Sequence, residues 1–270
     1  MSGGILNRIK GFFQDRLWLW VFYPAQKRYL IRTSKFFPRE WAFYALSEWE
    51  NQKKEIEKEL SGIKKRKFLT NIKIEVSGQR FRVKYYSYRH RFFHLLENLA
   101  YQSEAMRNFN TLLYLAEKGI GVPRPLVLAE ECRGKIALES VLIMEDLEPA
   151  LSYRQMLERL KNDPKELENF LTQLVQSLAQ LHLARVYNRD TDKNVLVKIK
   201  NGNYKFFYFD FDNVFFWRKI TKNRVAGTLR HFFNTRPLKL SPAQKEKFIN
   251  IYLQHKKTKL ERISYKKHLK

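Results

Sequence analysis

Carboxylate and amide side chains gather at the ends of two predicted strands in the last third of the sequence. Asp190 and Asn194 bracket one loop, whereas Asp210 and Asp212 directly follow the second strand. Hard oxygen donors of this kind suit Mg²⁺, and two or three of them leave coordination room for water and phosphate oxygens. An isolated loop aspartate is more often only a turn former. The set as a whole therefore indicates a magnesium site that could hold a nucleotide.

Regular elements are predicted on both sides of these loops. Apolar residues recur at helical spacing over residues 167–183, which predicts a core helix. Residues 195–199 and 204–209 flank the turn Asn201-Gly202 and indicate a β-hairpin. The region from Trp217 onward is predicted to be helical and basic. Helix 167–183 and this hairpin are expected to position the candidate site.

The first half of the chain predicts a small antiparallel sheet and one helix. Alternating residues at 71–76 and 80–86, separated by a glycine turn, indicate a hairpin. A helix is predicted over 102–117, and further strands over 126–129 and 136–145. These elements precede the carboxylate loops and form a separate group.

Two helical patterns precede the first hairpin. Residues 5–22 form a basic amphipathic pattern that fits either a membrane surface or an ordinary helix covering the core. Residues 40–60 predict a second helix that ends in charged side chains, and the basic run 64–67 marks a loop. Residues 1–70 are accordingly expected to form an amphipathic, basic N-terminal extension.

The composition limits the partners and the compartment. The chain has 270 residues with 52 Lys and Arg against 27 Asp and Glu, a net charge of +25. This field attracts polyanions, namely nucleic acid, an anionic membrane surface or a phosphorylated substrate. The single Cys132 excludes an intramolecular disulfide and fits a reducing compartment. The apolar run 17–25 is too short to span a bilayer, so neither a transmembrane helix nor a signal peptide is expected.

The order of these residues resembles the lipopolysaccharide kinases of the protein-kinase-like fold. The resemblance runs from the strand that holds Lys84 to the helix near Phe233, and it is carried by short segments in a fixed order. These are Phe81-Arg82-Val83-Lys84, Ser103-Glu104-Ala105-Met106, residues 117–125, which are similar to the Gly-x-x-Pro-x-Pro connection of this group, Ile143-Met144-Glu145-Asp146-Leu147, Tyr187-Asn188-Arg189-Asp190 and Phe209-Asp210-Phe211-Asp212. It implies an α+β, two-lobed fold with a small N-terminal lobe of β-sheet plus helix (71–147) and a larger, mainly helical C-terminal lobe (148–270).

The resemblance assigns an ATP site to the first of these lobes. Lys84 would contact the nucleotide α- and β-phosphates, and Glu104 would orient that lysine. The backbone from Glu145 to Leu147 would hydrogen-bond the adenine. No glycine-rich phosphate loop precedes Lys84, because Gly78 is the only glycine there.

The same resemblance assigns the chemistry to the second lobe. Asp190 would accept the proton of the acceptor hydroxyl, and Asn194 and Asp210 would hold Mg²⁺. Two departures stand out: Asn188 occupies the position of the motif histidine, and the interval from Asp190 to Asn194 is one residue shorter than the usual kinase spacing. A pseudokinase is therefore an alternative to an active enzyme.

The acceptor implied by the resemblance is a Kdo or heptose sugar on lipid A in the lipopolysaccharide inner core. Lys193, Arg224 and Arg230 are the candidate acceptor contacts, because cationic side chains pair with phosphates and carboxylates. Such a kinase would lie on the cytoplasmic face of the bacterial inner membrane, next to anionic lipid. The alternative from another class is a basic, non-catalytic protein that binds nucleic acid or another polyanion. That alternative explains the charge but not the ordered site residues, so nucleic acid is not the expected partner. The oligomeric state is not predicted.

Overall fold

The computed structural model describes residues 19–22, 28–34, 39–60, 69–76, 78–88, 102–134, 136–188, 190–211, 214, 220–238 and 240–256. The chain divides into two compact units. The first comprises Met1–Met106 and Pro125–Asp146, and the second comprises Arg107–Arg124 and Leu147–Lys270. The predicted boundary at residue 147 falls next to this division, whereas residues 107–124 were not expected to group with the second unit.

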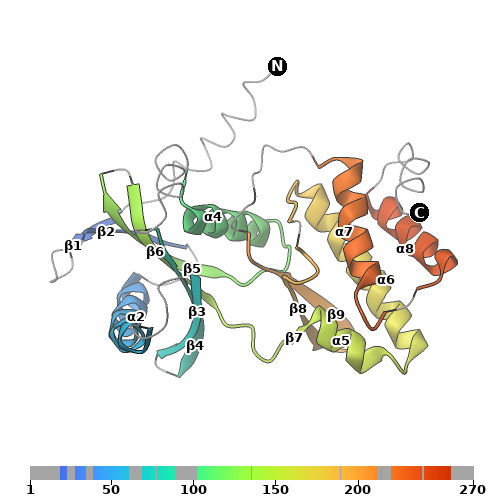
Figure 1. Ribbon diagram of the computed structural model, residues 1–270, viewed down its shortest axis with the longest axis horizontal. Coiled ribbons are helices and arrows are strands. Elements are labelled where there is room, and N and C mark those ends of the chain that lie inside the picture. The colour runs from blue at the N-terminus through green and yellow to red at the C-terminus, as the bar shows by residue number, and fades with distance from the viewer. Residues whose placement is uncertain are drawn as a thin grey trace, which may run out of the picture. The chain divides into compact units, whose positions relative to one another are not determined.

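The first unit contains a six-stranded antiparallel sheet in the order β1-β2-β5-β6-β4-β3. Its strands are β1 (Leu19–Phe22), β2 (Arg28–Thr33), β3 (Leu69–Val76), β4 (Gln79–Ser87), β5 (Pro125–Arg133) and β6 (Ile136–Glu145). The predicted hairpin is confirmed as β3–β4, and Ile72 pairs with Val83 in its register. Figure 1 shows this hairpin continuing the sheet beyond β6.

Helix α2 (Arg39–Leu60) contributes to the core of the first unit. Its small and aromatic residues alternate with charged ones, so one side can pack on the sheet. The buried apolar cluster joins residues of this helix to strand residues: Ala42, Ala45, Leu46 and Trp49 with Ile31, Ile74, Phe81, Val83, Leu126, Val127, Ala129, Val141 and Ile143. A buried ion pair adds to this contact, because Lys53 Nζ lies 2.7 Å from Glu139 Oε2 on β6. The helix is therefore part of the folded unit.

Residues 1–70 were expected to form a separate N-terminal extension, but the described part of this segment belongs to the first unit. Leu19–Phe22 forms strand β1 rather than the end of a helix, and Leu19 pairs with Ile31 of β2. The segment contains aromatic and β-branched residues, which favour strands. Its apolar residues also fit a helical spacing, so the sequence pattern alone does not distinguish a helix from a strand that pairs at the sheet edge. The rest of the amphipathic pattern, residues 5–18, lies outside the described residues. The first unit thus includes β1, β2 and α2.

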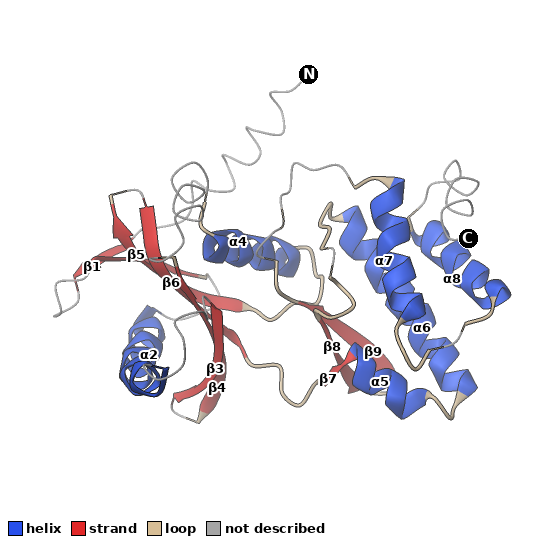
Figure 2. Cartoon of the chain, viewed as in Figure 1, coloured by secondary structure: helices blue, strands red, loops and turns tan. Residues whose placement is uncertain are grey.

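The second unit is mainly helical and carries a three-stranded sheet. It includes most of α4 (Glu104–Glu117) and all of α5 (Tyr153–Leu160), α6 (Pro164–Leu183), α7 (Lys222–Asn234) and α8 (Pro242–His255), and the strands β7 (Leu151–Ser152), β8 (Val195–Lys200) and β9 (Asn203–Tyr208) pair in that order. Figure 2 separates these helices and strands by colour. The predicted α+β class, helix 167–183 and the second hairpin are confirmed.

Aromatic packing joins α6 to the small sheet. The Phe170 ring lies 4.9 Å from the Tyr204 ring and 5.6 Å from the Phe206 ring, measured between centroids. Helix α6 begins at an Asp163 N-cap followed by Pro164, a favourable combination at a helix start. This packing holds β8 and β9, from whose ends the candidate site loops run. No helix in the described part of the chain is both long and apolar enough to cross a membrane.

Candidate active site

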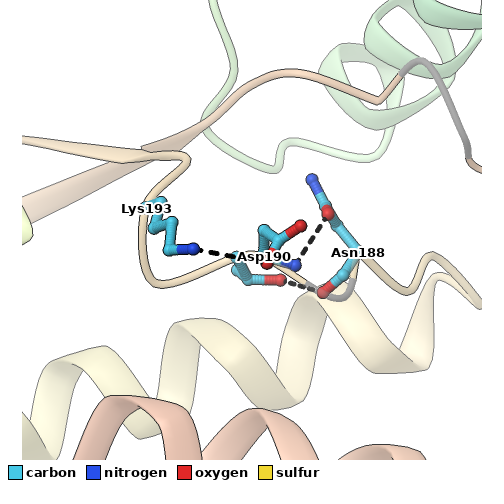
Figure 3. A network of polar contacts seen from close by, with 4 residues as sticks. Asn188, Asp190 and Lys193 are labelled. Atoms are coloured by element: carbon cyan, nitrogen blue, oxygen red, sulfur yellow. Dashed lines mark hydrogen bonds and ion pairs between the residues drawn. The ribbon is translucent and has the colours of Figure 1, made fainter. Parts of the chain in front are cut away.

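The loop between α6 and β8 carries Asp190 and is closed by short-range hydrogen bonds. The Asn188 side chain accepts from the Asp190 amide through Oδ1 at 3.1 Å, an Asx turn (Figure 3). The Lys193 amide donates to the Asp190 carbonyl and the Asn194 amide to the Thr191 carbonyl, both at 3.1 Å. Two successive turns therefore span the interval between Asp190 and Asn194, which explains how the shorter loop still closes.

The Asp190 carboxylate faces solvent. Its side chain is 56% exposed, and the Lys193 ammonium, 74% exposed, lies 3.8 Å from Oδ1 (Figure 3). An exposed pair at this distance is screened by water and holds neither group firmly. The carboxylate is thus accessible to an incoming hydroxyl, with a cation beside it.

A second loop, after β9, is tied directly to the first. Asn188 Nδ2 donates to the Asp210 carbonyl at 2.8 Å, and the Phe209 amide donates to the Asn194 carbonyl at 3.0 Å. Asp210 has a positive φ of 63°, a conformation that turns the chain sharply at this residue. These bonds bring Asp190, Asn194 and Asp210 together in the second unit. Asp212 lies outside the described residues.

Buried groups behind the second loop fix its position. Phe211 is 1% exposed, and its amide donates to Oδ1 of the buried Asn108 on α4 (Glu104–Glu117) at 3.3 Å. The Tyr208 amide donates to the Gly121 carbonyl at 2.9 Å. A Cβ at Gly121 would lie 2.0 Å from the Phe206 carbonyl oxygen, so only glycine permits this approach. Residues 107–124 thus support the strand that leads into Asp210.

The donor set fits magnesium. Asp210 offers a carboxylate and Asn194 an amide oxygen, and proteins commonly bind Mg²⁺ through one or two carboxylates while phosphates and water complete the shell. Among the described residues, no group of three or more His, Cys, Asp or Glu side chains could hold a metal ion. A metal ion that arrives with a nucleotide is consistent with both observations.

Arg224, one of the residues predicted to contact the acceptor sugar, lies beside the start of the loop that carries Asp190. Its guanidinium carbon is 5.5 Å from the centre of the Tyr187 ring, and Tyr187 directly precedes Asn188. Cation–π contact of this kind orients the charge without consuming its hydrogen-bond donors. Arg230 is exposed further along α7.

Lys84 and Glu104 belong to the first unit. Lys84, on β4, is 4% exposed, and its ammonium lies 5.2 Å from the centre of the Tyr86 ring. Glu104 is the first residue of α4 and is 7% exposed. Both are charged side chains in a buried environment, which is unusual for surface-type residues and consistent with a functional role.

Glu145 and Leu147 lie where the chain passes from one unit to the other. Glu145 ends β6 and pairs with Phe81 of β4, whereas Leu147 is buried in the second unit. Between them, Asp146 Oδ1 accepts from Arg82 at 3.4 Å. The segment therefore begins at the end of β6 and continues into the residues that follow it, and its role as an adenine contact stays a prediction.

Sequence reasoning missed three residues that organise the site. Asn188 drew notice only as a departure from the motif, although its amide joins the two loops. Asn108 and Gly121 were not singled out. An asparagine inside an otherwise apolar helix pattern and the Gly121-Val122-Pro123 sequence were the available signals for these two.

These features define a mixed α and β protein with antiparallel sheets, and comparison with known proteins shows its fold and its family. A solved structure described as WaaP in complex with acyl carrier protein has the same fold, with a TM-score of 0.55 and 15% sequence identity over 71% of this chain and 77% of that chain. The lipopolysaccharide kinase (Kdo/WaaP) family model matches residues 47–252. The chain belongs to this family and is a kinase of the lipopolysaccharide core. A search of the curated proteins finds no match.

Proposed function

We propose that the chain transfers the γ-phosphoryl group of ATP to a Kdo or heptose hydroxyl of the lipopolysaccharide inner core. The observation that carries this proposal is the tie between the two loops of the second unit. Through Asn188, it holds the Asp190 loop against the backbone of Asp210. Accurate placement of a base and of phosphate-charge stabilisers provides most of the catalysis in phosphoryl transfer.

Asp190 is the proposed base. Its exposed carboxylate accepts the proton of the sugar hydroxyl while the hydroxyl oxygen forms a bond to the γ-phosphorus. The bond between that phosphorus and the β,γ-bridging oxygen breaks, and ADP leaves with the electron pair. Mg²⁺ bound to Asn194 and Asp210 would neutralise charge on the phosphate oxygens. Lys193, whose Nζ lies 3.8 Å from Asp190 Oδ1, would add positive charge beside the transferring group.

ATP is proposed to bind through residues at the unit boundary and in the first unit. The Glu145–Leu147 backbone would hydrogen-bond the adenine, and Lys84 would contact the α- and β-phosphates. Glu104 would orient Lys84. The burial of both charged side chains supports this pairing. A buried charge is costly unless a group of opposite charge or a hydrogen-bond partner compensates for the lost water.

The acceptor is proposed to be recognised through its anionic groups. Arg224, held over Tyr187 beside the loop, and the exposed Arg230 would pair with phosphates or carboxylates of the inner core. The net charge of +25 would draw the protein to an anionic membrane surface on the cytoplasmic side, where such acceptors are made.

Transfer of labelled phosphate tests the proposal. Purified full-length protein is incubated with Mg²⁺ and γ-labelled ATP, with either Kdo-lipid A or heptosylated inner core as acceptor. The matched variants are Asp210→Asn and Glu158→Gln, the second being an exposed carboxylate paired with Lys161 in α5. We expect label in one acceptor, its loss in Asp210→Asn and its retention in Glu158→Gln.

Two other results would overturn the proposal and identify the alternatives. ATP binding without transfer to either acceptor indicates a pseudokinase. No ATP binding, together with salt-dependent binding of nucleic acid, indicates a polyanion-binding protein, because the affinity of such a protein falls steeply with salt.

A further inference from the structure

A buried carboxylate in the first unit has no role in the proposed chemistry. Glu130 on β5 is 4% exposed, and its Oε1 accepts hydrogen bonds from two hydroxyls, those of Ser103 and of Ser140. Burial raises the pKa of Glu130, whereas the two serines and the positive charge of Arg32 act in the opposite direction. Burying a carboxyl group is costly unless it is well hydrogen-bonded, so this arrangement calls for an explanation.

One of the two serines caps helix α4. Ser103 directly precedes the helix, and its Oγ accepts from the Met106 amide at 3.0 Å while donating to Glu130. The Ala105 amide donates to the Tyr88 hydroxyl at 3.3 Å. Two of the otherwise unpaired amides of the first turn are thereby satisfied by groups anchored in the sheet. The start of α4 is fixed to β5 through Glu130 and to the end of β4 through Tyr88.

The fixed turn contains Glu104, and the strand to which it is joined contains Lys84. Lys84 and Tyr86 alternate along β4, and Tyr88 directly follows its last residue at the same spacing, so the three residues share one side. The Lys84 ammonium lies 5.2 Å from the Tyr86 ring, and the Tyr86 and Tyr88 rings stack at 6.2 Å. A continuous series of contacts thus leads from Lys84 to the amide that follows Glu104.

We propose that Glu130 and Ser103 are positioning residues for the ATP site: the carboxylate holds the first turn of α4 so that Glu104 orients Lys84. This inference rests on the proposed function of Lys84 and Glu104. It makes Glu130, 26 positions away in sequence, responsible for the placement of Glu104, the proposed partner of Lys84. Ser140 on β6 donates to the same oxygen but does not contact the capped Met106 amide of α4 through its own hydroxyl, as Ser103 does.

Matched serine variants separate positioning from general stability. Ser103→Gly removes the hydroxyl that donates to Glu130, and glycine is still an acceptable N-cap. Ser140→Ala removes the other hydrogen bond to the same oxygen and leaves the Ser103 cap of α4 in place. The readouts are the dissociation constant for ATP and, separately, the midpoint of thermal unfolding.

We expect Ser103→Gly to weaken ATP binding about tenfold and Ser140→Ala to weaken it less than about twofold, at comparable unfolding midpoints. Glu130→Gln retains an acceptor oxygen and is expected to stay within about threefold of wild type. Equal effects of the two serine variants on ATP binding would overturn the proposal.

A double-mutant cycle with Glu104→Gln provides the decisive comparison. If Ser103 acts through Glu104, Ser103→Gly has little further effect on ATP affinity in the Glu104→Gln background. Additive losses overturn the positioning role. Lys84→Ala serves as the reference: if it leaves ATP binding unchanged, the proposed function of Lys84 fails, and that result is distinct from failure of the Ser103 and Glu130 inference.

Discussion

Replacing Asn188 with alanine removes two hydrogen bonds that organise the proposed catalytic loops. One joins Nδ2 to the Asp210 carbonyl at 2.8 Å, and the other joins the Asp190 amide to Oδ1 at 3.1 Å. A hydrogen bond between neutral groups contributes about 1 kcal/mol net, so the pair amounts to about 2 kcal/mol. If that energy maintains the alignment of Asp190 with Asp210, kcat falls about 30-fold.

The assay is steady-state phosphoryl transfer at saturating acceptor, with kcat and the KM for ATP determined separately. Asn188→Ala is expected to lower kcat and to leave the KM for ATP within about twofold, because ATP phosphates are assigned to Lys84. Asn169→Ala is the matched control. This exposed asparagine on α6 forms hydrogen bonds with Glu166 and Gln173 of the same helix. The control variant should leave both constants unchanged.

A second variant tests the identity of the lost interaction. Asn188→His restores the residue of the family motif and can again donate to the Asp210 carbonyl, so it should recover part of the lost kcat. The reasoning is refuted if Asn188→Ala keeps kcat within about twofold of wild type while the protein transfers phosphate normally.

Three further predictions concern stability, and thermal unfolding checks each of them. Gly121→Ala places a Cβ 2.0 Å from a β9 carbonyl oxygen and should destabilise the fold by about 2 to 4 kcal/mol, whereas Gly227→Ala, with open space around it, should be neutral or stabilising. Lys53→Met should cost about 3 to 5 kcal/mol because it removes the cation that is paired with the buried Glu139 carboxylate, and adding Glu139→Leu should recover most of that loss. Burial lowers the pKa of His182 from its ordinary 6.5 to about 3. Between these pH values the unfolded chain binds a proton on His182 that the folded chain does not bind, so the stability of the fold decreases as the pH drops below 6.5. That fall amounts to about 2 kcal/mol at pH 5, and His182→Gln should abolish it; an unchanged pH slope in His182→Gln would contradict the assignment.

Elements with strong local patterns were predictable from the sequence. Residues 167–183 repeat apolar side chains at helical spacing, and α6 covers them. The Ser77-Gly78 and Asn201-Gly202 turns placed both hairpins, because glycine at these positions adopts the positive φ that the turns need. Strand β1 was mistaken for the end of a helix, since its pairing with β2 depends on a tertiary partner that spacing does not show.

The candidate site was predictable as an order of residue types but not as a set of contacts. Asp190, Asn194 and Asp210 were identified from the loops that follow regular elements, and the structure brings them together through Asn188. The supporting bond from Asn108 to the Phe211 amide joins residues 103 positions apart. No local pattern encodes such a contact, because a buried amide finds its partner only when distant segments pack.

The most direct test of the central claim measures what the Asp190 carboxylate does. Asp190→Asn preserves the shape of the side chain and the backbone bonds of the loop but cannot accept the hydroxyl proton. We predict that kcat for transfer from ATP to the lipopolysaccharide acceptor falls by about 10² to 10⁴, with ATP affinity unchanged. An Asp190→Asn protein that transfers phosphate at a rate close to that of wild type would contradict the account.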